Sequence, residues 1–447
     1  MKIVLTIHHF LPNYSAGAEI YASRLASWLT NHGHEVEVVC VESITHTGDS
    51  DLECRHEIYE GVSVWRLYFN LECAPDPFRW SLENPVIGDW FDQFLRQVSP
   101  EIVHVNSCYL LSASTIKAVK KQLLPLVVTL HDFWFVCPRI SLLKPNGELC
   151  KVPEAPEECA WCLATEKRRF RWSELASRGV AGSVAQRWLV SSRFASLLGI
   201  QPDGSEIAYR RESLMNALGQ ADVVIAPSEF LRAVFVGQGL DPDRIIYSRY
   251  GLDTSHWITP SESDREASED LRVSYVGQLA PHKGVHLLVQ AFNRLDFSGR
   301  RARLKVYGDP TVFFQYAESL RRMARGNPAI EFAGRFDNHR VAEVLDQTDV
   351  VVVPSIWYEN SPIAIMEALT TGTPVVTTNL GGMPELVQHN VNGLLFEVND
   401  TDSLARQLQR LLDEADLVAN LTAKARPVRM IEDEMRQMLS IYDELLH

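Results

Sequence analysis

Val350-Val351-Val352-Val353-Pro354-Ser355 is an uninterrupted apolar run that stops at a proline, and Glu359-Asn360-Ser361-Pro362-Ile363-Ala364-Ile365-Met366-Glu367 begins after three further residues. A run of valines without polar alternation predicts a strand that is buried on both faces, as in a parallel sheet. Pro362 suits the first turn of a helix, because proline has no N–H that would be left unpaired there. The stretch therefore predicts a strand, a loop and a helix, which is the repeating unit of an α/β fold.

The same alternation continues on both sides of this stretch. Short apolar runs that we interpret as buried strands lie at 3–7, 36–41, 62–67, 102–105, 126–130, 223–226, 245–247, 273–276, 304–307, 330–332, 375–377 and 394–396. Helical patterns separate most of these runs, for example at 18–31 and 89–98. Strands that alternate with helices lie parallel, so we predict doubly wound parallel sheets.

One polar stretch interrupts the alternation and divides the chain. Residues 254–271 are mostly polar and charged, which indicates a linker. We predict two Rossmann-like domains, 1–253 and 272–425, that face a deep cleft, and an insertion in the first domain at about 136–215. The tail, 426–447, has apolar residues at helical spacing, and we expect it to form a helix that packs back on the first domain.

The composition excludes several classes of protein. The chain has 447 residues, with 43 Lys and Arg against 57 Asp and Glu, so its formal charge is −14. An acidic protein is a poor candidate for non-specific nucleic-acid binding, so we expect no nucleic-acid partner. No run reaches the roughly 18 apolar residues of a membrane-spanning helix, and residues 1–9 do not resemble a secretory signal. We expect a cytoplasmic protein whose eight cysteines are reduced.

Two common nucleotide-binding motifs are absent from the sequence. No Gly-x-Gly-x-x-Gly follows a predicted strand, and no Walker A sequence occurs. Dehydrogenases of the Rossmann type and P-loop enzymes need these loops to hold phosphate, so the sequence argues against both.

The segment from Glu359 to Glu367 combines an anion site with two carboxylates. The N–H groups of Ile363 and Ala364 open the predicted helix, where free amides and the helix dipole favour an anion. Glu359 precedes the helix, and Glu367 lies about two turns further on. The two carboxylates are therefore able to meet hydroxyl groups at two separate parts of one ligand.

This segment resembles the retaining glycosyltransferases of family 4, which have the GT-B fold, and it matches their pattern of two glutamates separated by seven residues. The resemblance extends over nearly the whole chain. It implies that Glu359 contacts the donor sugar and that Glu367 binds the ribose of the nucleotide. It also places Ser361, Ile363 and Ala364 against the donor. The alternative interpretation is that Glu359 only caps the helix and that Glu367 faces solvent.

The loop Val276-Gly277-Gln278-Leu279-Ala280-Pro281-His282-Lys283-Gly284 follows the first strand of the second domain. The family places an Arg and a Lys in this loop, where both neutralise the donor diphosphate. Lys283 matches the Lys, and its charge suits a pyrophosphate leaving group. Gln278 stands at the position of the Arg, so one cation is missing. Gln278 is still able to donate a hydrogen bond, and Arg335 or His282 are candidates for the missing charge.

Two matches to the family lie in the first domain. The loop Asn13-Tyr14-Ser15-Ala16-Gly17-Ala18-Glu19 contains small residues, which let backbone approach a ligand closely, and Gly17 permits unusual backbone angles. By the resemblance, Gly17 and Ala18 lie beside the donor phosphates and the acceptor. His131 follows the strand at 126–130, where the family has a His that contacts the donor sugar. The alternative interpretations are that residues 13–19 form an ordinary turn between strand and helix, and that His131 has a structural role.

Four cysteines fall close together, at Cys137, Cys150, Cys159 and Cys162. Four thiolates in one loop region, two of them as C-x2-C, are a candidate tetrahedral zinc site with a structural role. Unligated packing cysteines and an iron–sulfur cluster are the alternatives. We expect no catalytic metal, because GT-B enzymes generally stabilise the leaving group with protein groups.

The segment 166–200 is basic in an otherwise acidic chain. Seven Lys and Arg stand against two Glu, and aromatic and aliphatic residues are interleaved with them. A basic amphipathic segment is able to lie on an anionic membrane surface, so a peripheral contact with the inner membrane face is one interpretation. A helical insertion with a solvated basic face is the other.

These features together predict a retaining glycosyltransferase of the hexosyltransferase type. It would move a sugar from a UDP- or GDP-sugar to a glycan or lipid-linked acceptor, in the synthesis of cell-surface polysaccharide or glycoconjugate. The alternatives are a nucleotide-sugar epimerase or hydrolase of the same fold and a catalytically silent nucleotide-sugar-binding protein.

Overall fold

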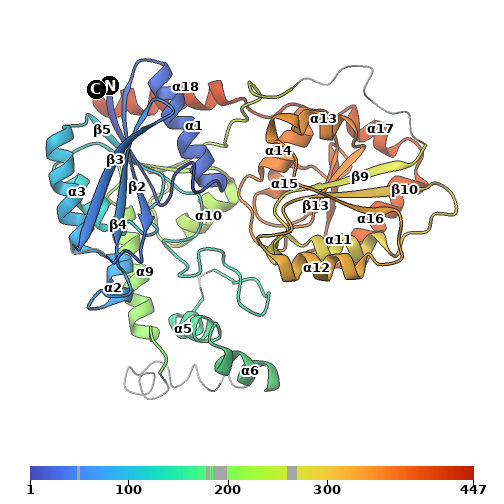
Figure 1. Cartoon of the computed structure of the whole chain (residues 1–447), viewed down its shortest axis with the longest axis horizontal. Coiled ribbons are helices and arrows are strands. Elements are labelled where there is room, and N and C mark those ends of the chain that lie inside the picture. The colour runs from blue at the N-terminus through green and yellow to red at the C-terminus, as the bar shows by residue number, and fades with distance from the viewer. Residues whose placement is uncertain (48–50, 153, 178–181, 183, 185–198, 259–268) are drawn as a thin grey trace. The chain divides into compact units, whose positions relative to one another are not determined.

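The structure is a computed structural model that describes residues 1–47, 51–152, 154–177, 182, 184, 199–258 and 269–447 (Figure 1). The chain divides into two compact units. The first unit contains Met1–Pro227, Leu231–Ser248 and Met435–His447, and the second contains Ser228–Phe230 and Arg249–Glu434. Most of the predicted linker, residues 259–268, lies outside the described residues, and the first strand of the second unit begins at Leu271, just inside the predicted linker.

The first unit is built on an eight-stranded sheet with the order β3-β4-β2-β1-β5-β6-β7-β8. Its strands are β1 (Lys2–Ile7), β2 (Glu35–Ser43), β3 (Leu52–Tyr59), β4 (Val62–Phe69), β5 (Ile102–Val105), β6 (Leu126–Thr129), β7 (Val223–Ala226) and β8 (Ile245–Tyr247). The helices between them are α1 (Gly17–Asn31), α2 (Pro77–Leu82), α3 (Pro85–Val98), α4 (Ser114–Lys121), α5 (Pro156–Ala164), α6 (Arg168–Ala176), α9 (Gly204–Leu218) and α10 (Glu229–Gly237). The central strands are apolar and buried, as the sequence predicts.

One strand of this sheet was not predicted. β3 forms a hairpin with β4 and is the only antiparallel strand of the described part of the sheet. It lies at the edge, and its middle residues Arg55, His56 and Glu57 are exposed. An edge strand of this kind lacks the continuous apolar run by which buried parallel strands are recognised.

The terminal helix α18 (Ile431–Leu446) begins in the second unit, and its later residues belong to the first. Tyr442 is completely buried, and its hydroxyl lies 2.6 Å from Nδ1 of His104 on β5. Nε2 of the same imidazole lies 2.7 Å from Oγ1 of Thr129 on β6. A buried hydrogen-bond chain therefore attaches the end of the chain to the first sheet.

The second unit has a six-stranded parallel sheet with the order β11-β10-β9-β12-β13-β14. Its strands are β9 (Leu271–Val276), β10 (Ala302–Tyr307), β11 (Ile330–Gly334), β12 (Val350–Val353), β13 (Val375–Thr378) and β14 (Gly393–Phe396). Its helices are η1 (Pro281–Lys283), α11 (Val285–Phe292), α12 (Phe314–Met323), η2 (Asn338–Arg340), α13 (Val341–Asp346), α14 (Ile363–Thr370), α15 (Met383–Leu386), α16 (Thr401–Asp413) and α17 (Leu417–Thr422). With two doubly wound sheets, the predicted fold class is confirmed.

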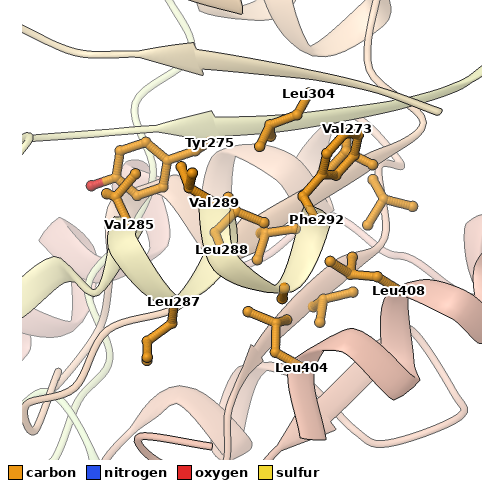
Figure 2. Packing of buried hydrophobic residues seen from close by; sticks show 14 of the residues in the cluster. Val273, Tyr275, Val285, Leu287, Leu288, Val289, Phe292, Leu304, Leu404 and Leu408 are labelled. Carbon is orange, nitrogen blue, oxygen red and sulfur yellow. The ribbon is translucent and has the colours of Figure 1, made fainter. Parts of the chain in front are cut away.

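The core of the second unit lies on both faces of this sheet. Figure 2 shows Leu288 and Phe292 of α11 between the sheet residues Val273 and Leu304 and the helix α16. The side chains of β12 alternate between two clusters, with Val350 and Val352 in one and Val351 and Val353 in the other. This burial on both faces explains why β12 is an unbroken run of valines.

The order of the strands places two loops side by side. From β9 the chain proceeds to β10 and β11 on one side of the sheet, and it then returns to β12 on the other side of β9. β9 and β12 are therefore neighbours, and Val273 pairs with Val350. The loops after β9 and β12 therefore leave the sheet at its topological switch point, where ligands bind in folds of this kind. These are the two loops that the sequence analysis selected in the second domain.

Candidate functional site

A buried carboxylate lies at the centre of the site in the second unit. Glu359 is 8% exposed and follows β12, and its Oε1 accepts three hydrogen bonds. The donors are Nζ of Lys283 at 2.6 Å, Nε1 of Trp357 at 2.7 Å and Oγ of Ser355 at 2.9 Å. Burial by itself would raise the pKa of Glu359, but the charge of Lys283 and the three hydrogen bonds outweigh it and lower the pKa. Glu359 is therefore ionised at neutral pH.

Close contact between the loops after β9 and β12 brings Lys283 to Glu359. Gly284 has φ +69°, and a β-carbon on it would lie 1.9 Å from the carbonyl oxygen of Pro354. The N–H of Ile356 donates to the carbonyl of His282 at 2.9 Å. The backbones touch here, so only glycine fits at position 284.

The ammonium of Lys283 also lies over an aromatic ring. Its Nζ is 5.2 Å from the ring centroid of Trp357, within the range of a cation–π interaction. The ring of His282 lies 4.7 Å from the same indole ring. Burial and, secondly, the charge of Lys283 lower the pKa of His282 to about 4. His282 is therefore neutral at neutral pH and does not replace the missing arginine.

Gln278 and Arg335 are the other two candidates for contacts with the phosphates. Gln278 is exposed, and its carbonyl accepts a hydrogen bond from the hydroxyl of Tyr275 at 2.7 Å, which holds the backbone of the loop. Arg335 lies 3.4 Å from Asp309, and its side chain is 77% exposed. In this loop Lys283 is thus the cation that faces the buried carboxylate.

A glycine turn after β13 fixes the backbone of Glu359. The N–H of Gly382 donates to the carbonyl of Glu359 at 2.7 Å. A β-carbon on Gly381 would lie 2.7 Å from that carbonyl oxygen, and one on Gly382 would lie 1.9 Å from the carbonyl oxygen of Asn360. The two glycines allow this close approach.

The helix α14 begins at Ile363, four residues after Glu359. Pro362 is its N-cap, and the first amides that bond within the helix are those of Ile365 and Met366, both to the carbonyl of Pro362. The helix itself gives no partner to the amides of Ile363 and Ala364, as expected at an N-terminus. Ser361 is buried, and its hydroxyl contacts the sulfur of Met366 at 3.3 Å.

Glu367 lies further along α14 and is 8% exposed. A carboxylate this deeply buried is not a solvent-facing helix residue, which was the alternative interpretation. The second unit therefore carries a lysine, a helix N-terminus and two buried carboxylates along its switch point, an arrangement suited to an anion that is linked to hydroxylated groups.

In the first unit, His131 is half-buried and follows β6. Its ring packs edge-on against Tyr21 of α1, with the ring centroids 4.9 Å apart. Burial, together with His104 and His8, lowers the pKa of His131 to about 3. The imidazole is therefore neutral at neutral pH and is suited to hydrogen bonding with an uncharged ligand group.

The turn before α1 does not use the backbone freedom of Gly17. Gly17 begins α1 and is exposed, and it does not have a left-handed φ. A β-carbon there would meet no atom within 4 Å. Ala18 is half-buried in the same turn, and the N-cap residue Ala16 provides no side-chain hydrogen bond. A ligand at this turn would therefore meet open space beside Gly17 and a helix N-terminus without a side-chain cap.

Residues that the sequence analysis missed hold the loop before α1. The buried guanidinium of Arg66 donates to the carbonyl of Leu11 and to the carboxylate of Glu42, each at 2.8 Å or less. Asn13 donates to the same carboxylate at 2.7 Å, and the Tyr14 hydroxyl donates to the carbonyl of Glu42 at 3.0 Å. These partners lie on β2 and β4, so only the folded sheet reveals them. In the second unit, Ser355 and Trp357 were also missed, because they contact Glu359 only in the folded loop after β12.

The four clustered cysteines lie in the first unit, and among the described residues they form no disulfide bond. Burial raises the pKa of Cys150 and Cys162 to about 12 and that of Cys159 to about 11, and the neighbouring thiols add to each shift. They thus lie in one region. Within the described ranges, however, no group of three or more His, Cys, Asp or Glu is arranged to hold a metal ion. The zinc site stays a prediction.

The basic segment is only partly described. Lys167, Arg168, Arg169 and Arg171 are exposed at the start of α6, and Trp172 is 61% exposed. Seven further members of the segment lie outside the described residues: Arg178, Arg187, Trp188, Arg193, Phe194, Leu197 and Leu198. Among the helices that are described, none has the length and apolarity needed to cross a membrane.

Two family models match the chain. The model for glycosyl transferases group 1 matches residues 260–428, and the model for a glycosyl transferase 4-like domain matches residues 16–174. A glycogen synthase of Mycobacterium tuberculosis is 30% identical over 439 residues, which are 97% of this chain and 91% of that protein. The putative colanic acid biosynthesis glycosyltransferase WcaL of Salmonella typhimurium is 29% identical over 194 residues. That match spans 42% of this chain and 47%, about half, of the relative's length.

Solved structures share the fold over the whole chain. Anabaena HepE in complex with UDP has a TM-score of 0.67 at 16% identity and covers 99% of this chain and 100% of its own. The sucrose-phosphate synthase of Thermosynechococcus elongatus has a TM-score of 0.66 at 20% identity, with coverage of 99% and 98%. The chain therefore belongs to the glycosyl transferases group 1 and is a glycosyltransferase with the GT-B fold.

Proposed function

We propose that the protein transfers a hexose from a UDP- or GDP-sugar to a glycan or lipid-linked acceptor, with retention of the anomeric configuration. The observation that carries this proposal is the contact between Lys283 and Glu359 at the switch point of the second unit. A single cation held beside a buried carboxylate at a helix N-terminus suits a diphosphate that is bonded to a sugar.

Each polar group at this site then has one role. Lys283 and the amides of Ile363 and Ala364 stabilise the charge that develops on the diphosphate as the glycosidic bond breaks. Gln278 donates a neutral hydrogen bond to the phosphates in place of the missing arginine. Because the three hydrogen bonds to Glu359 all fall on Oε1, its Oε2 is the oxygen that receives sugar hydroxyls.

The remaining donor contacts follow from the family resemblance. Glu367 accepts hydrogen bonds from the ribose diol, and Ser361 lies between the two carboxylates. In the first unit, neutral His131 contacts the sugar, and Gly17 and Ala18 approach the phosphates through the open space beside the helix. The family resemblance implies that attack and departure occur on the same face of the sugar, and no residue is assigned as a covalent nucleophile.

The class of donor is supported by structural relatives. Anabaena HepE has been solved with UDP, with UDP and glucose, and with UDP-glucose. Relatives named for colanic acid and amylovoran biosynthesis support a polysaccharide acceptor. The exposed basic side chains and Trp172 of α6 support a peripheral contact with the membrane face where lipid-linked acceptors lie.

A donor panel tests the proposal. A ligand that binds only the folded protein raises the melting temperature, so UDP- and GDP-sugars are compared by thermal shift and the best one is measured by calorimetry. We expect one nucleotide sugar to bind, and Lys283→Ala and Glu367→Ala to weaken it. Absence of binding by every nucleotide sugar in the panel would refute the proposed function.

A further inference from the structure

The indole of Trp357 contacts both charged groups of the site in the second unit. Its Nε1–H donates to Oε1 of Glu359 at 2.7 Å, and Nζ of Lys283 lies over its ring, 5.2 Å from the centroid. Trp357 is half-buried and lies in the loop after β12, two residues before Glu359. The edge of one side chain therefore meets the carboxylate, and its face meets the ammonium.

Two further contacts join Trp357 to the loop that carries the lysine. The ring of His282 lies 4.7 Å from the indole ring, at an interplanar angle of 59°. The N–H of Ile356, the residue before Trp357, donates to the carbonyl of His282 at 2.9 Å. A ring contact and a backbone hydrogen bond therefore hold the indole in place against the loop after β9.

The three groups that donate to Oε1 of Glu359 differ in charge. Lys283 is a cation, whereas the Trp357 indole and the Ser355 hydroxyl are neutral donors. A diphosphate attracts the ammonium, which weakens the hold of Lys283 on the carboxylate. The neutral indole N–H does not follow the phosphates in this way. It keeps Oε1 paired and leaves Oε2 directed to the sugar.

The ring of Trp357 has a separate effect on Lys283. Gln278 stands where the family has a second cation, so the position of Lys283 determines how the loop presents positive charge to the diphosphate. A lysine carries its charge on a flexible four-carbon stem and loses rotamer freedom when it is held. The face of an indole attracts an ammonium without neutralising it. The ring therefore restricts the position of the ammonium and leaves its charge available.

We propose that Trp357 is a positioning residue for sugar transfer, whose N–H orients Glu359 for the sugar and whose ring holds Lys283 for the diphosphate. This inference rests on the proposed function and adds a residue that the glutamate and lysine motifs do not include. Trp357 acts through these two side chains and needs no contact of its own with the donor. Small displacements of groups around a reacting bond lower the rate strongly, so its loss should affect turnover.

Two substitutions separate the two contacts. Trp357→Phe keeps a ring face for the ammonium but removes the N–H, so kcat should fall at least about tenfold. The dissociation constant of UDP or GDP, whichever belongs to the donor that the thermal-shift panel selects, should change by less than about twofold in calorimetry. Trp357→Gln keeps an N–H donor but removes the ring, and it should weaken the same nucleoside diphosphate at least about threefold.

The pH dependence of kcat/KM distinguishes the orientation of Glu359 from a packing effect. Burial raises the pKa of Glu359, and Lys283 and then the hydrogen bond of Trp357 lower it. In Trp357→Phe this pKa should rise, so the acid limb of kcat/KM should move to higher pH. Among the described residues, Lys283, His282 and Tyr275 are the other titratable groups that interact with the charge of Glu359, and all three remain in the variant.

Trp257→Phe is the matched control. Trp257 is also a half-buried tryptophan of the second unit that packs against its core. Its Nε1 has no hydrogen-bond partner among the described residues. This variant should keep the wild-type kcat and acid limb. In all variants, kcat is measured as release of the nucleoside diphosphate, with p-nitrophenyl glucoside, galactoside and mannoside as acceptors.

The outcomes are distinct. A wild-type kcat and acid limb in Trp357→Phe would overturn the inference, and so would an equal fall of kcat in Trp257→Phe. If Trp357→Phe does not fold, Trp357→Gln decides, because unchanged affinity for the nucleoside diphosphate in that variant would overturn the inference. A wild-type protein that binds no nucleotide sugar would instead refute the proposed function.

Discussion

Replacing Lys283 by alanine is the most informative perturbation of the site. In the wild type, the Lys283 ammonium lies 2.6 Å from a carboxylate that is 10% exposed, and the lysine side chain is 25% exposed. A hydrogen bond between charged groups contributes about 1.5–3 kcal/mol to stability. Because the lysine is partly solvated and Ser355 and Trp357 still pair with Glu359 in the variant, we expect a loss of about 1–2 kcal/mol. A completely unpaired buried charge would cost about 3–5 kcal/mol.

The loss of folding stability in Lys283→Ala should depend on pH in one direction. The pKa of Glu359 is lowered in the folded protein, so its contribution to stability is present above the pKa of an unfolded glutamate, about 4.3, and is lost as the pH falls through the folded value. Lys283→Ala removes the charge that contributes most to this lowering. The difference in stability between wild type and variant should therefore be complete at neutral pH and shrink below about pH 4.

The assay is urea denaturation at several pH values, combined with turnover measured at saturating donor. Turnover should fall at least tenfold, because Lys283 faces the charge of the leaving group. Lys305→Ala is the control, since Lys305 is an exposed lysine of the same unit and its loss should change stability by less than about 0.5 kcal/mol. A double-mutant cycle of Lys283→Ala with Glu359→Gln measures the coupling directly. Coupling below about 0.3 kcal/mol, together with unchanged turnover, would refute the reasoning.

Four further predictions concern other parts of the molecule. Glu367→Ala should weaken donor binding by about 1.5–3 kcal/mol in calorimetry, because a ribose diol loses a charged acceptor; unchanged affinity would remove Glu367 from the site. His131→Ala should lower kcat more than donor affinity, and a near-wild-type rate in steady-state kinetics would contradict its contact with the reacting sugar. Gly284→Ala should cost at least about 2 kcal/mol in denaturation experiments, since its β-carbon would lie 1.9 Å from a carbonyl oxygen, whereas Gly326→Ala, with open space around it, should cost less. If the clustered cysteines bind metal, elemental analysis should find about one zinc per chain, and replacing Cys159 and Cys162 by Ser should release it; metal-free protein with full activity would end that hypothesis.

Much of the fold was predictable, because its central strands are short runs of apolar residues separated by helices. β12 illustrates this, since both of its faces are buried and every residue is valine. β3 was missed because an exposed edge strand has no such constraint on its sequence. Gly17 permits unusual backbone angles but does not adopt them, and glycine in a loop motif does not by itself reveal the local φ or the space around it.

The site was predicted less completely than the fold. Glu359 and Lys283 were each selected from a motif, but their contact joins residues 76 positions apart and depends on the pairing of β9 with β12. Ser355 and Trp357 contact the carboxylate only because the loop after β12 folds back on itself. Sequence patterns identify residue types at strand ends, whereas hydrogen-bond partners are set by strand order and loop packing.

The most direct measurement of the central claim is the anomeric configuration of the product. The donor selected by the thermal-shift panel is mixed with the protein and an acceptor glycoside, and the anomeric protons are followed by NMR. We predict a new glycosidic linkage with the anomeric configuration of the donor sugar, formed as the nucleoside diphosphate is released. A linkage of inverted configuration, an epimerised nucleotide sugar or free sugar as the sole product would contradict it.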